Sequence, residues 1–125
     1  MKLTAWVTIA SLLMYIWVFI KAGQARGKHK IKAPLCDGPT EFLSAMRVQA
    51  NTVEQLIIFL PLLWLSAFYE GDVTAAILGA IWVVGRIVYA LGYYQAPDKR
   101  SAGFAISSVA AIGLLIAAIL GLILH

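Results

Sequence analysis

Four long apolar runs dominate this chain of 125 residues and decide what it can fold into. In the second run the charged residues are confined to the first half. A hydrocarbon core about 30 Å thick needs about 20 helical residues, so each run is long enough to cross a membrane. The sequence therefore predicts an integral membrane protein with helices at about 3–21, 40–69, 73–94 and 102–124.

The composition excludes the main alternatives. Hydrophobic residues make up 62% of the chain and charged residues 13%, against about 45–50% and about 25% in soluble domains. A soluble domain of this size buries too little surface to hide so much apolar side chain, and the runs lack the alternation of a β-barrel. Short linkers at 70–72 and 95–100 force antiparallel neighbours. We therefore expect an all-α, four-helix up-down bundle with one domain over 1–125.

The first run has a second interpretation, a cleaved signal peptide, because Gly23-Gln24-Ala25 forms a small-x-small triplet. The run is long for a signal peptide and carries Trp6 and Trp17. These features favour a retained helix.

The net charge of +4 is best interpreted by position. Basic residues gather in the segment 21–32 and at Lys99 and Arg100, whereas the opposite side has only Lys2. The positive-inside rule places both basic loops in the cytoplasm and both termini outside. The lysines would contact lipid headgroups, and no aromatic-interleaved basic surface indicates nucleic acid. The membrane would be a bacterial inner membrane or the endoplasmic reticulum, and the lack of a retention signal favours the former.

Metal, nucleotide and disulfide chemistry have no support in the sequence. There is no cluster of cysteine and histidine for a metal and no glycine-rich loop for a phosphate. Cys36 is the single cysteine, which excludes an internal disulfide.

Polar residues inside a membrane are costly and so indicate function or helix pairing. Two stripes of them occur at helical spacing, one in the second run and one in the third, and each stripe shares a helix face. We expect the stripes to face each other across antiparallel helices. They are Arg47, Asn51 and Glu54, and Arg86, Tyr89 and Tyr93.

Depth can be estimated by counting from Gly71 at about 1.5 Å per residue. Glu54 then lies about 25 Å and Arg86 about 22 Å from the turn. The matched depth predicts a structural ion pair, Glu54–Arg86, with Asn51 bridging it, which by itself could simply pin two helices together. Arg47, the two tyrosines and Arg100 converge near the same end. The whole group favours a binding site for an anionic, peptide-like solute beside a lipophilic partner.

The same residues carry a family resemblance. The run Arg47-x-Gln49-x-Asn51-x-x-Glu54, followed by Phe59-x-Pro61, resembles the signature of the MAPEG family, membrane-associated proteins in eicosanoid and glutathione metabolism that include the microsomal glutathione transferases. The similarity extends to further motifs on both sides. These are Gly38-Pro39-x-Glu41-Phe42 upstream, and Arg86-x-x-Tyr89-x-x-Gly92-Tyr93 and Arg100 downstream.

The resemblance implies a homotrimer that binds glutathione as co-substrate between neighbouring subunits, near the cytoplasmic face. Arg100 would be catalytic and activate the thiol. The implied function is detoxification by a glutathione transferase or peroxidase that delivers the thiol to lipophilic electrophiles or lipid hydroperoxides. The glutathione-binding residues would be Arg47, Asn51, Glu54, Tyr89 and Tyr93 of one subunit, with Arg26 and Gln49 of the next.

The chain departs from the glutathione-using eicosanoid enzymes of that family at two positions. Gln55 stands where they have tyrosine, and Gly27 stands where they have a second arginine. The alternative function is a non-catalytic lipid-binding or scaffold member of the same family, for which Arg100 would be dispensable. A small transporter has less support, because there is no broken helix or inverted repeat.

Overall fold

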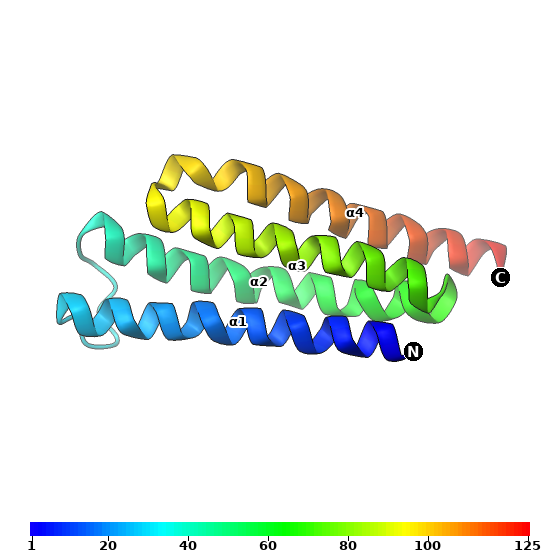
Figure 1. Cartoon of the computed structure of the whole chain (residues 1–125), viewed down its shortest axis with the longest axis horizontal. Coiled ribbons are helices and arrows are strands. Elements are labelled where there is room, and N and C mark those ends of the chain that lie inside the picture. The colour runs from blue at the N-terminus through cyan, green and yellow to red at the C-terminus, as the bar shows by residue number, and fades with distance from the viewer.

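The computed structural model describes residues 1–125 and contains four long helices and one short 3-10 turn. The helices lie side by side with nearly parallel axes, α1 beside α2 and α4 beside α3, and both termini lie at the same end (Figure 1). Each is long and apolar enough to cross a membrane, so the chain is an integral multi-pass membrane protein. The predicted all-α bundle is confirmed. Its elements are α1 (Lys2–His29), α2 (Thr40–Tyr69), α3 (Asp72–Gln95), η1 (Pro97–Arg100) and α4 (Ser101–Leu124).

The first helix is longer than predicted. It continues through the basic segment to His29 and ends at Lys30, whose φ of 56° is left-handed. Hydropathy marks only the part of a helix that suits lipid, whereas alanine, glutamine, arginine and lysine all have high helix propensity in water. Arg26 therefore lies on the last turns of α1, and not in a loop as the sequence suggested.

A carboxylate ties the helices together at the end that holds the termini. Gly71 turns the chain between α2 and α3 with a φ of 151°, a conformation that favours glycine. The Asp72 carboxylate then accepts hydrogen bonds from the backbone N–H groups of Leu3 and Thr4, at 3.2 and 2.9 Å, and from the Thr4 hydroxyl at 2.6 Å. The start of α1 is thereby fixed to the α2–α3 turn.

Helices α3 and α4 approach closely because glycines lie between them. A Cβ atom on Gly103 would collide with the backbone nitrogen of Tyr89, and one on Gly85 would lie 2.7 Å from the backbone nitrogen of Ser107. Small residues allow backbones to come together in membranes, where helix association depends on close packing. The position of Tyr89, a predicted site residue, is thus set by the packing of α4.

An aromatic stack joins α2 to α3 in the middle of the bundle. The rings of Phe59 and Trp82 are both buried and lie 3.8 Å apart between centroids, with 5° between their planes. Trp82 is one turn before Arg86 on α3. The stack therefore forms an apolar floor beneath the polar residues of the two helices.

Candidate functional site at the basic end of the bundle

Arg86 is the buried centre of the polar group. Only 1% of its surface is exposed, and its Nη2 donates hydrogen bonds to Asn51 Oδ1 at 2.8 Å and to Thr52 Oγ1 at 2.9 Å. The Tyr89 ring covers the guanidinium, with 4.1 Å from Cζ to the ring centroid. A buried cation needs such partners because it has lost its water. Nε and Nη1 of Arg86 have no hydrogen-bond partner.

The predicted ion pair between Glu54 and Arg86 is not formed. Glu54 lies on the exposed face of α2, and its carboxylate is 3.5 Å from Nη1 of Arg47, which is also about half exposed. The depth estimate fixed positions along the helix but not around it. At about 100° per residue, Glu54 points about 110° away from the direction midway between Asn51 and Thr52, which face α3. Asn51 is buried and faces Arg86 as predicted, but it bridges no carboxylate.

Aromatic rings connect the buried arginine to the exposed one. Beyond Tyr89, the next ring on α3 is that of Tyr93, at 5.5 Å between centroids and nearly perpendicular. Cζ of Arg100 lies 5.6 Å from the centroid of the Tyr93 ring. Cations thus cap both ends of a tyrosine pair, one in the protein interior and one at the surface.

The turn η1 holds Arg100 in place. The backbone of this turn folds back onto α3 so closely that a Cβ atom on Gly92 would collide with the carbonyl oxygen of Lys99. Nη1 of Arg100 also donates to the Pro97 carbonyl at 2.5 Å. Arg100 itself remains exposed, so its remaining donors are free for a ligand.

Arg26 and Gln49 meet on a different side of the bundle. They line a hollow of about 190 Å³ between α1 and α2. Arg26 donates to the Leu35 carbonyl at 2.8 Å and lies over the Phe42 ring, and Gln49 donates to the Tyr15 hydroxyl at 2.8 Å. The structure therefore groups the predicted binding residues into two sets, Arg26 with Gln49 and the remainder near α3 and the outer face of α2.

Sequence reasoning missed two partners in these networks. Thr52 accepts from Arg86, and Tyr15 accepts from Gln49. Thr52 lies among the polar residues of α2, and this position could have identified it as a partner of Arg86. Tyr15 had no such signal, because it stands in an otherwise apolar run.

The sequence also matches one protein family and several known proteins. The sequence profile of the MAPEG family matches residues 4–120. A protein of Synechocystis that is described as uncharacterized is 44% identical, over 95% of this chain and 87% of its own length. Microsomal glutathione S-transferase 2 of Mus musculus is 36% identical, over 96% of this chain and 82% of its own. Leukotriene C4 synthase of Cavia porcellus is 33% identical, over 98% of this chain and 82% of its own length.

The four-helix fold and the polar group at one end define a multi-pass membrane protein with a candidate site at a helix interface. The chain belongs to the MAPEG family. The resemblance inferred from the motifs of α2 and α3 is thereby confirmed.

Proposed function

We propose that the protein is a membrane-bound glutathione transferase, with peroxidase activity as a related reaction of the same thiol. Arg47, Asn51, Glu54, Tyr89 and Tyr93 would bind the tripeptide, and Arg100 would activate its sulfur. Microsomal glutathione S-transferase 2 and leukotriene C4 synthase among the relatives support this assignment.

The observation that carries the proposal is the exposed pair Arg47 and Glu54. Opposite charges 3.5 Å apart stand on the outer face of a helix whose composition suits a membrane. Charged residues on a membrane-spanning helix commonly mark functional sites. Glutathione offers matching groups, since its carboxylates suit arginine and its ammonium suits Glu54.

The two sets of binding residues support a site between copies of the chain. Arg47 and Gln49 are two residues apart on α2, so their side chains point about 160° away from each other. One copy cannot place both against a single small ligand. Two neighbouring copies can, if the outer face of α2 in one copy meets the hollow at Arg26 and Gln49 in the next. We include a homotrimer in the proposal on the strength of the family.

Arg100 would act by stabilising the thiolate. A free thiol with a pKa of about 8.5 is only about 3% ionised at pH 7, and a guanidinium beside the sulfur favours the charged form. The thiolate then attacks an electrophilic carbon of a lipophilic substrate and forms a carbon–sulfur bond. In a substitution, the leaving group departs with the electron pair of the bond that breaks. In an addition to a double bond, the displaced π electron pair takes up a proton from water.

A glutathione titration of the purified protein tests the proposal, read by calorimetry and by ultraviolet absorbance of the thiolate. Arg100→Ala is the test variant. Lys99→Ala is its matched control, because it removes the neighbouring cation, whose ammonium donates a hydrogen bond to Gln95 at 3.4 Å. We expect wild type and Lys99→Ala to bind glutathione as thiolate. Arg100→Ala should return the thiolate to the few per cent of free glutathione.

Two results would contradict the proposal. If glutathione at millimolar concentration does not bind, the transferase assignment fails and the alternative function, a non-catalytic lipid-binding or scaffold protein, is favoured. If glutathione binds without a thiolate signal, the pocket stands but the role of Arg100 is wrong.

A further inference from the structure

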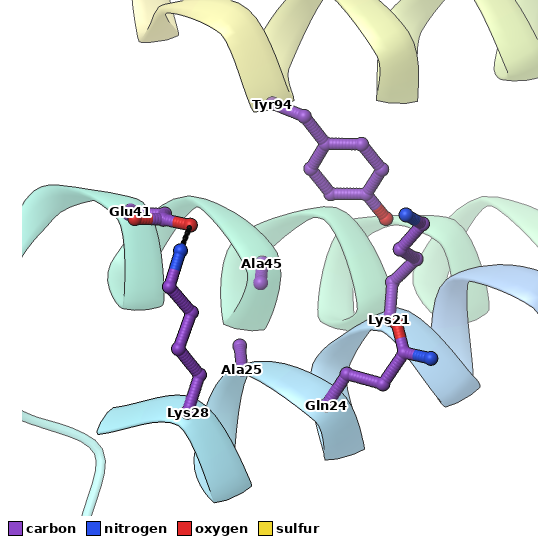
Figure 2. Close-up of a pocket in the computed structure, with 7 residues that line it drawn as sticks. All are labelled: Lys21, Gln24, Ala25, Lys28, Glu41, Ala45 and Tyr94. Carbon is purple, nitrogen blue, oxygen red and sulfur yellow. Dashed lines mark hydrogen bonds and ion pairs between the residues drawn. The ribbon is translucent and has the colours of Figure 1, made fainter.

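A second polar pocket lies between α1, α2 and α3, and none of the residues assigned to glutathione lines it. It has a volume of about 290 Å³. Figure 2 shows Lys21 and Gln24 rising from α1 and Tyr94 reaching from α3 toward Lys21. The remaining lining residues are Ala25, Lys28, Glu41 and Ala45.

Lys21 is the free cation of this pocket. The other lysine, Lys28, is 2.7 Å from the Glu41 carboxylate, so these two charges neutralise each other. Lys21 makes no ion pair, and its Nζ lies 5.9 Å from the centroid of the Tyr94 ring. The Tyr94 hydroxyl is buried without a hydrogen-bond partner. A cation and an unsatisfied hydroxyl donor together suit an anionic oxygen.

A separate apolar hollow lies between α1 and α3, along the chain segments that precede Lys21 and Tyr94. It has a volume of about 420 Å³, and every residue that lines it is hydrophobic. Trp17, which lines the apolar hollow, packs edge to face against Tyr94, which lines the polar pocket, with 6.0 Å between the ring centroids. Trp17 is one turn before Lys21, at the point where the apolar run of α1 ends. The hollow is lined by Ala10, Leu13, Met14, Trp17, Val83, Ile87 and Leu91.

We propose that this groove between α1 and α3 binds one anionic phospholipid of the surrounding bilayer. Its phosphate would lie between Lys21, Gln24 and the Tyr94 hydroxyl, and an acyl chain would follow the apolar hollow toward Ala10. The charge lies at the end of an apolar span, which is the level of the lipid headgroups. The polar pocket and the apolar hollow follow one another as the headgroup and the acyl chain of such a lipid do, and their sizes are comparable.

This proposal does not depend on the glutathione assignment. The groove uses none of the residues proposed for glutathione. Lys21 and Tyr94 can therefore be changed without touching the thiol chemistry.

The test is a competition between two lipids with the same acyl chains, phosphatidylglycerol and phosphatidylcholine, read by native mass spectrometry of the full-length protein released from mixed micelles. We expect wild type to retain phosphatidylglycerol about fivefold better, the preference that one lysine near a membrane surface supplies. Lys21→Gln should abolish that preference and Tyr94→Phe should reduce it. Lys32→Gln removes an exposed cation outside the groove and should leave the preference for phosphatidylglycerol unchanged.

Three outcomes would overturn the proposal. Equal retention of both lipids by wild type means that no anionic headgroup is selected. An equal loss in Lys21→Gln and Lys32→Gln means that general surface charge is responsible. Displacement of phosphatidylglycerol by inorganic phosphate means that the apolar hollow holds no acyl chain. Because Lys21→Gln should still bind glutathione like wild type, a failure here is distinguishable from a failure of the transferase assignment.

Discussion

Arg86 and Glu54 illustrate two ways in which a charged residue can exist in a membrane protein. Arg86 is enclosed by an amide, a hydroxyl and an aromatic face within its own chain. Glu54 lies outside the bundle and pairs with Arg47 on the same helix. The first arrangement is formed within one copy and contributes to its stability. The second has its charges on the outer face, which is the arrangement expected of a residue that binds something else.

This difference predicts unequal effects on stability. Asn51→Ala removes an acceptor from the buried guanidinium and should lower the free energy of unfolding by about 1–3 kcal/mol. Glu54→Gln alters an exposed pair and should change it by no more than about 0.5 kcal/mol. Thermal unfolding in detergent without glutathione measures both. A cost for Glu54→Gln as large as that for Asn51→Ala would mean that Glu54 does support Arg86.

At the scale of the helices, hydropathy was sufficient to locate α2, α3 and α4 within a residue or so. It missed the end of α1, because the last two turns of that helix are basic and hydropathy is not sensitive to helices in water. Counting residues also gave the position of each polar residue along its helix but not its direction around the helix axis. Glu54 and Arg86 were therefore correctly placed at similar depths but wrongly paired with each other. The rotation of each helix about its axis depends on which small residues let two helix backbones approach. It is therefore determined by both helices and cannot be obtained from the hydropathy of one.

The close contact of α3 and α4 gives a prediction that compares two glycines. Gly103→Ala places a methyl group against the backbone of Tyr89 and should lower the free energy of unfolding by about 1–3 kcal/mol. Gly23→Ala in α1 meets no atom within 4 Å, and should leave stability unchanged or raise it by up to about 1 kcal/mol. Melting temperatures in one detergent provide the comparison. Equal effects of the two substitutions would show that α3 and α4 separate without cost.

At the scale of the whole molecule, one end of the bundle concentrates both chemistry and charge. The loop after α1 and the turn η1 lie together at the end opposite the termini (Figure 1). Arg100, the groove at Lys21 and the hollow at Arg26 are all near that end. A water-soluble tripeptide and a lipophilic substrate could meet only at such a boundary. Its side of the membrane therefore determines which glutathione pool the protein would use.

The single cysteine makes that side measurable. Cys36 is exposed in the loop between α1 and α2, and the basic residues around it favour the cytoplasmic side. A membrane-impermeant maleimide should therefore label inside-out vesicles and leave right-side-out vesicles unlabelled. The double variant Cys36→Ser, Glu70→Cys moves the thiol to the α2–α3 turn and should reverse the result. If the wild-type thiol reacts only from outside, the orientation is inverted and the site would draw on extracytoplasmic thiols.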